Sequence, residues 1–235
     1  MKTNIRNIIT IIGISAIAFS ACKKDLDLNP ISNLSDASYW KTTDQFDAFV
    51  SGLHTRFRSH STSFVRLGEF RSEIFGTDPG STATFTGEAT QGLERMWLQT
   101  LDPDNPGVSN FGGFYDNINQ INLLIDKLNT TTIVSDATKK NYLGMAYGMR
   151  AFYYFQLYRS WGKAIIQTEP TATIDVANLS KPASTADEVM AFIKADIDLS
   201  NNNYENDYTF SARSKKGYWS KSATQMLKAE VYLWT

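Results

Sequence analysis

Apolar residues recur at steps of three and four along much of the chain, the spacing that places them on one face of an α-helix. This pattern predicts five helices, over residues 43–58, 116–128, 141–160, 186–199 and from near 222 to 234. The helix over 141–160 is apolar nearly all round, which predicts a central, buried helix. The last helix carries no Gly, Pro or polar cap after Trp234, so the sequence predicts a chain cut from a longer protein.

The ends and spacing of these helices indicate hairpins. Thr42 with Gln45, and Thr185 with Glu188, fit the capping-box pattern, and Asp116 is the predicted N-cap of the second helix. The second helix pairs with the third and the fourth with the fifth, and 186–220 is close to the roughly 34-residue period of a tetratricopeptide repeat. The predicted fold class is therefore mainly α, with tetratricopeptide-like hairpins and long irregular loops. Gly144 and Gly148, one turn apart, predict the close approach of a neighbouring helix backbone.

Residues 1–21 have the composition of an export signal. A basic end is followed by an apolar run over 8–18, which is too short to span a bilayer as a helix, and by small residues. The only cysteine of the chain, Cys22, follows directly, where a bacterial lipoprotein signal places the residue that receives the lipid. We therefore expect a lipoprotein signal over 1–21, a lipidated tether over 22–34 and the folded domain over 35–235. An ordinary secretory signal or a membrane-anchor helix stays open.

Composition and motifs exclude several kinds of chemistry. The chain has 23 Lys and Arg against 24 Asp and Glu, which excludes a generic nucleic-acid-binding face. One Cys and two His leave no basis for a disulfide framework or a Cys/His metal cluster, and motifs for phosphate binding or hydrolysis are missing. We expect no cofactor, no metal and no catalytic residue, although the many carboxylates leave a glycosidase pair possible. His54 and His60 are expected to face solvent.

Aromatic residues make up 13% of the chain and gather in the central helix. Most of them must pack in the core, and their tyrosine hydroxyls then need hydrogen-bond partners. Arg150 is expected to be a buried or half-buried anchor that pairs with a carboxylate or with helix carbonyls rather than with a ligand. The loop over 76–113 is the preferred binding region, because long polar loops are often functional. Within it Trp97, Asp78 and Arg95 could contact a sugar or peptide, although Trp97 is somewhat more expected to pack the loop onto the helices.

Several segments resemble the SusD/RagB family, in the family's own order. These are residues 25–58, LGEFRSEIFGTD at 67–78, FYDNINQINLLIDKL at 114–128, MRAFYYFQLYRSWG at 149–162, 183–200 and KAEVYLWT at 228–235. The resemblance implies a mostly helical, tetratricopeptide-like fold in a lipid-anchored protein of the Bacteroidetes outer membrane, exposed at the cell surface. Members of this family are considerably longer than this chain, which agrees with the expected truncation.

The resemblance also implies a function. Such a protein captures a nutrient, here with oligosaccharide as the leading ligand and peptide as the other, and passes it to a SusC-like TonB-dependent transporter over which it lies as a lid. This is a binding function without catalysis. Two alternatives stay open on the sequence, namely a lipid-anchored hydrolase of the envelope and a helical-repeat scaffold for protein interactions.

Overall fold

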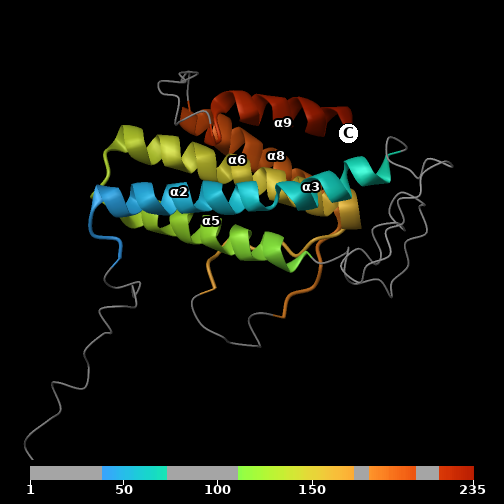
Figure 1. Cartoon of the computed structure of the whole chain (residues 1–235), viewed down its shortest axis with the longest axis horizontal. Helices are drawn as coiled ribbons and strands as arrows, with labels where there is room; N and C mark the ends of the chain where they lie inside the picture. The colour runs from blue at the N-terminus through green and yellow to red at the C-terminus, as the bar shows by residue number, and fades with distance from the viewer. Residues whose placement is uncertain (1–38, 73–110, 172–179, 205–216) are drawn as a thin grey trace, which may run out of the picture. The chain divides into compact units, whose positions relative to one another are not determined.

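The computed structural model describes residues 39–72, 111–171, 180–204 and 217–235. Thr42–Thr235 form one compact unit, to which the following account applies. Its helical elements are α2 (Thr43–Ser59), α3 (Ser61–Leu67), the 3-10 helix η1 (Glu69–Arg71), α5 (Gly112–Thr130), α6 (Asp136–Trp161), α8 (Ala186–Tyr204) and α9 (Lys221–Leu233) (Figure 1). Within the described ranges the only β-type pairing is one isolated bridge, between Ala164 and Ser184. All five predicted helices are present.

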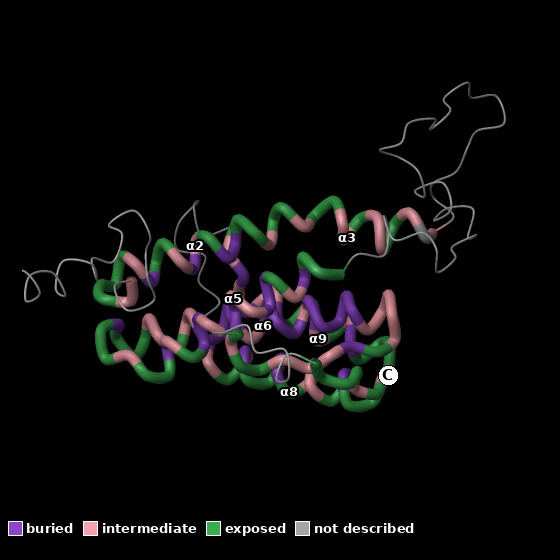
Figure 2. Tube along the Cα trace, turned by 90° about the horizontal axis from the view of Figure 1, so that it is seen from below, coloured by how far each residue is buried: buried purple, intermediate pink, exposed green. Residues whose placement is uncertain are grey.

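The helices form two hairpins, α5 with α6 and α8 with α9, and α6 packs against both helices of the second hairpin. The chain reverses direction between α5 and α6 and again between α8 and α9, as the colour gradient of Figure 1 shows. The most extensive helix-to-helix packing joins α6 to α8, and α6 also contacts α5 and α9. Buried positions lie where the helices face one another, and the outward faces are exposed (Figure 2). The predicted pairing and the mainly α fold class are confirmed.

The core is built around α6. Tyr153, Tyr154 and Phe155 have no exposed surface, which confirms that the aromatic run is packing rather than a solvent-facing platform. Ser135 caps the start of α6 through the N–H of Thr138, one turn before the predicted start. The helix ends at Gly162, whose φ of 72° is a left-handed conformation that glycine adopts without strain.

The capping boxes are present and one predicted cap is wrong. Thr42 and Gln45 exchange hydrogen bonds at the start of α2, as Thr185 and Glu188 do before α8. By contrast, α5 begins at Gly112, a full turn before Asp116. Burial of Phe114, which is 2% exposed, favours this earlier start, and Asp116 instead forms an ion pair with Arg56 of α2.

The predicted approach of a neighbouring helix is present at Gly144, where the hydroxyl of Ser200 in α8 donates to the glycine carbonyl at 2.6 Å. The atoms nearest to both glycines belong to aromatic side chains. A Cβ at Gly144 would lie 2.9 Å from the ring of Tyr204, and one at Gly148 would overlap the indole of Trp219. Both rings come from the end of α8 and the segment before α9. The glycines therefore leave space for two aromatic rings, through which the second hairpin packs against α6.

The N-terminal predictions lie outside the described residues. They comprise the signal over 1–21, the lipid attachment at Cys22 and the tether over 22–34. None of the helices in the described ranges combines the length and apolar character that crossing a bilayer requires.

Candidate functional site

The predicted ligand-contacting residues Trp97, Asp78 and Arg95 also lie outside the described residues. The structure describes the scaffold on both sides of their loop. On the N-terminal side the chain passes through α3 and η1 to Ser72, and on the C-terminal side it re-enters at Phe111, directly before α5. The candidate site is therefore built from the elements that hold this loop.

An aromatic cluster connects the two ends of the loop. We call His60, Phe64, Phe114 and Tyr153 the aromatic joint. The ring centroids of Phe64, from α3, and Phe114, from α5, lie 5.5 Å apart, and His60 is 5.5 Å from Phe114. Tyr153 of α6 also belongs to this cluster, and its ring centroid lies 5.7 Å from that of His60. Ring pairs at these distances add to the stabilisation from burial alone, so α3 and α5 are held on the central helix at the base of the loop.

His60 is half-buried, so the expectation that it faces solvent is wrong. Its Nδ1 lies 2.8 Å from the hydroxyl of Tyr153, and Asn117 of α5 donates its Nδ2–H to the same hydroxyl at 2.8 Å. Burial lowers the pKa of His60 and raises that of Tyr153. Neutral imidazole and neutral phenol are the favoured forms, and the joint is held by polar as well as aromatic contacts.

A cleft of about 690 Å³ adjoins the aromatic joint, with which it shares Phe64, in the part of the chain that the structure describes. Its walls come from α2, α3, α6, the segment before α9 and α9 itself. The lining residues are His54, Phe57, Arg58, Phe64, Phe152, Gly217, Tyr218, Trp219, Ala223, Met226, Leu227 and Glu230. The lining is mostly aromatic and aliphatic, with Arg58 and Glu230 as the charged residues. A cleft of this kind suits an apolar group better than a sugar, whose hydroxyls need several donors and acceptors.

His54 borders this cleft and is 2% exposed, so its predicted exposure is wrong as well. Its Nδ1 is 2.8 Å from the carbonyl of Val50, and its Nε2 accepts a hydrogen bond from the backbone N–H of Trp219 at 2.9 Å. Because Nε2 is an acceptor, the proton lies on Nδ1. Burial lowers the pKa of His54 to about 4, so the ring is neutral at neutral pH. The partner is 165 residues away in sequence, and no local pattern indicates it.

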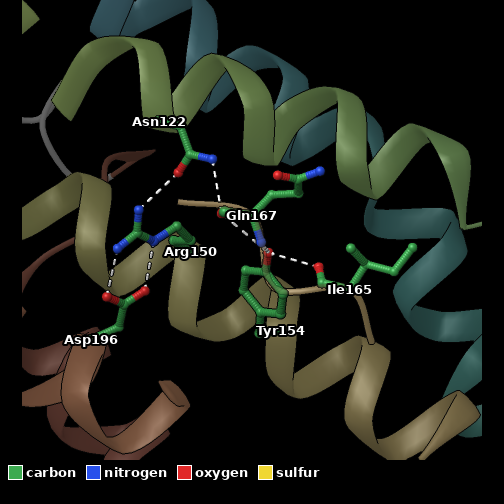
Figure 3. Close-up of polar contacts among 6 residues, drawn as sticks. All are labelled: Asn122, Arg150, Tyr154, Ile165, Gln167 and Asp196. Atoms are coloured by element: carbon green, nitrogen blue, oxygen red, sulfur yellow. Dashed lines mark hydrogen bonds and ion pairs between the residues drawn. The ribbon is translucent and has the colours of Figure 1, made fainter. Parts of the chain in front are cut away.

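The polar network of Figure 3 cross-links three helices. Arg150 of α6 donates from Nε and Nη2 to the two carboxylate oxygens of Asp196 in α8, at 2.7 and 2.8 Å. It also donates from Nη1 to Oδ1 of Asn122 in α5, at 2.8 Å. Asn122 in turn donates to the carbonyl of Gln167, at 2.9 Å. The prediction that Arg150 is an anchor is confirmed, and of its two predicted kinds of partner the structure shows the carboxylate.

The network extends to the segment after α6. The hydroxyl of Tyr154 accepts the N–H of Gln167 at 2.7 Å and lies within hydrogen-bond distance of the carbonyl of Ile165. Tyr115 accepts the N–H of Ile165 in the same way. These tyrosines have the partners that buried hydroxyls require. Because each of the three guanidinium nitrogens donates to a buried protein group, this network has a structural role. Among the described residues no group of three or more His, Cys, Asp or Glu could hold a metal ion.

These features define a scaffold of paired helices in which α3 and α5 meet the central helix α6 at one aromatic joint. A family described as "Starch-binding associating with outer membrane" matches the chain over residues 70–233. The chain therefore belongs to the SusD/RagB family.

Individual relatives agree with this assignment. SusD-like protein P38 of Formosa agariphila is 28% identical over 209 residues, covering 86% of this chain and 38% of that protein. The structure of B. fragilis NanU is 49% identical with a TM-score of 0.75, over 88% of this chain and 39% of that one. A SusD superfamily protein from Bacteroides vulgatus is 46% identical with a TM-score of 0.72, over 83% and 38%. The chain thus spans less than half the length of these relatives.

Proposed function

We propose that this chain is part of a cell-surface lipoprotein that binds an oligosaccharide and works with a SusC-like TonB-dependent transporter of the outer membrane. The observation that carries this proposal is membership of a family described by starch binding and outer-membrane association. The chain spans less than half of its relatives, so the activity proposed belongs to a protein of their length.

The scaffold supports a binding role for the loop over 76–113. Packing of α3 and α5 on α6 fixes the described residues on either side of this segment, which favours a binding role because less conformational freedom is then lost on binding. In this proposal Trp97 provides a flat apolar face for a sugar ring, and Asp78 and Arg95 form hydrogen bonds with its hydroxyls. Peptide is the second candidate ligand, because the same groups can contact a peptide backbone.

A glycan panel separates binding from hydrolysis. Purified protein is incubated with each glycan, and both calorimetric binding and the release of reducing ends are measured. We expect binding without release. Release of reducing ends would instead support a lipid-anchored hydrolase, and recovery of a stable protein partner without glycan binding would support a scaffold.

The role of the loop is tested by Trp97→Ala. Loss of a stacked indole is expected to weaken glycan binding by about tenfold or more, since stacking on an aromatic ring contributes on the order of 1–3 kcal/mol. The control is Trp234→Ala, at the exposed C-terminal end of α9. Equal binding by both variants and the wild type would contradict a ligand contact at Trp97.

The proposed anchor is tested by Cys22→Ser. We propose that residues 1–21 are removed, that Cys22 carries the lipid and that 22–34 tether the domain. Without its acyl chains the protein should leave the membrane fraction, because lipid chains provide most of the membrane affinity of such proteins. A variant that stays in the outer membrane as fully as the wild type would show that another contact, such as the transporter, holds it. Recovery of a TonB-dependent barrel with the native protein would support the partnership.

A further inference from the structure

His60 occupies the junction on which the aromatic joint depends. It is the C-cap of α2 and also the residue before α3, with φ −83° and ψ 0°. Its ring packs against Phe64, Phe114 and Tyr153, and its Nε2 lies near Gly113 at the start of α5. One imidazole therefore contacts each element that holds the candidate binding loop.

The hydrogen bonds of this junction have a defined direction. Asn117 donates its Nδ2–H to the hydroxyl oxygen of Tyr153, so the hydroxyl proton is available for Nδ1 of His60. His60 then carries its own proton on Nε2. Asn117 has no exposed surface, yet its Oδ1 has no hydrogen-bond partner among the described residues. A buried carbonyl without a partner is costly, so this oxygen requires an explanation.

We propose that His60, Tyr153 and Asn117 form a two-state hydrogen-bond relay that reverses its direction when His60 takes up a proton. In the charged state a proton from solvent is bound to Nδ1, which then donates to the oxygen of Tyr153. The hydroxyl hydrogen of Tyr153 turns to Asn117, whose side-chain amide has rotated to present Oδ1 as the acceptor. The three residues form two hydrogen bonds before His60 takes up the proton and two afterwards. The charged state uses Oδ1 of Asn117, the oxygen that has no partner in the neutral state.

The surrounding charges leave both states accessible. Arg56 of α2 and Asp116 of α5 face His60 and form an ion pair with each other. Arg56 lowers the pKa of His60 and Asp116 raises it, so their effects oppose one another, while burial lowers it further. On α6 the only polar contact of the ring is Tyr153, which is a neutral phenol because burial raises its pKa. The relay thus makes the joint of α3, α5 and α6 responsive to pH, independently of which ligand the loop binds.

NMR spectroscopy of the purified chain tests the relay directly, since the chain contains only two histidines. In long-range ¹H–¹⁵N spectra near neutral pH, His60 should be the Nε2–H tautomer and His54 the Nδ1–H tautomer. On acidification the side-chain amide signals of Asn117 should shift with the same midpoint as the His60 ring. An Nδ1–H tautomer at His60, or Asn117 signals that ignore its titration, would overturn the proposal.

A pair of variants on α5 gives the second test. Asn117→Leu removes one hydrogen bond from each state, but only in the charged state does it leave the hydroxyl hydrogen of Tyr153 buried without an acceptor. The midpoint of His60 should therefore fall by about half a pKa unit or more. Asn119→Leu, two residues further along the same helix and outside the relay, should leave the midpoint unchanged. An unchanged midpoint in Asn117→Leu would also overturn the relay. If that variant does not fold, as judged by circular dichroism, the wild-type titration decides.

Discussion

His54 and Arg150 are buried polar residues whose partners come from distant parts of the chain. His54 joins α2 to the backbone of Trp219, and Arg150 joins α6 to Asp196 and Asn122. Both are surrounded by aromatic and aliphatic side chains, where an unpaired polar group would be costly. Each therefore fixes the relative position of helices as well as filling space.

The stability of the fold should depend on the protonation of His54. Burial lowers the pKa of this residue in the folded chain to about 4, against 6.5 for a free histidine. Between these values the unfolded chain binds a proton and the folded chain does not, so stability is lost as the pH falls from 6.5 towards 4. At about 1.4 kcal/mol per pKa unit the loss approaches about 3 kcal/mol. Denaturant unfolding at several pH values measures it.

His54→Gln is the control for this pH dependence. Glutamine cannot take up a proton in this range, so the part of the slope that His54 causes should disappear, although the variant is less stable at neutral pH. A slope equal to that of the wild type would assign the effect to carboxylates instead.

Removing one partner of the buried ion pair should be more harmful than removing both. Arg150→Leu leaves Asp196, which is 1% exposed, with an uncompensated charge, and such a loss costs about 3–5 kcal/mol. The double variant Arg150→Leu, Asp196→Leu removes that charge and should recover part of the stability. Chemical denaturation of the wild type, both single variants and the double variant measures the coupling. If the stability lost in the double variant equalled the sum of the losses in the two single variants, Arg150 and Asp196 would not be coupled and the prediction would be wrong.

At the scale of elements, α6 determines how the two hairpins fit together. Its glycine positions accept the rings of Tyr204 and Trp219, and Trp219 is held in place by hydrogen bonds. Its indole N–H donates to Thr224 at 2.8 Å, and its carbonyl accepts the hydroxyl of Tyr204 at 3.0 Å. A ring fixed in this way cannot move aside easily.

Gly148→Ala should therefore destabilise the fold. A methyl group there overlaps the indole of Trp219, and overpacking of a core costs about 1–3 kcal/mol, against a gain of about 1 kcal/mol from the helix propensity of alanine. Gly52→Ala in α2 is the matched control, because nothing lies within 4 Å of a Cβ at this exposed position. It should stabilise by about 0.5–1 kcal/mol. Thermal unfolding compares the stability of the two variants. A Gly148→Ala variant more stable than the wild type would show that the indole of Trp219 moves aside to accommodate the methyl group.

At the scale of the whole compact unit, α9 buries one face and exposes another. Leu227 and Val231 pack into the core, whereas Met226, Leu233 and Trp234 are 75%, 88% and 53% exposed. Met226 also borders the apolar cleft. Exposed apolar side chains on one helix form a surface of the kind that promotes association.

We expect the 235-residue chain to self-associate through this surface at high concentration. The double variant Met226→Lys, Leu233→Lys should shift it towards monomer in sedimentation velocity experiments, with little change in circular dichroism. Leu199→Lys places the same charge on an exposed position of α8 and should have no such effect. A wild-type chain that stays monomeric, or equal association of all three proteins, would contradict this role of α9.

The sequence by itself determined the presence of the five long helices, their pairing and the central position of α6, but it did not indicate α3 or η1. These features depend on periodicity and on caps such as Thr42 with Gln45, which act over a few residues and can be recognised locally. The collinear family segments added the fold class for the same reason, because short-range patterns survive in order along the chain.

Only the tertiary structure decided what the isolated polar and small residues do. His54, His60 and Gly148 have partners 165, 93 and 71 positions away, at Trp219, Tyr153 and Trp219 again, and no local pattern indicates such contacts. The start of α5 likewise followed from burial of Phe114 against α3 rather than from a capping residue. Burial and hydrogen bonding between distant segments depend on how the helices pack, and the spacing of residues along one helix does not specify that packing.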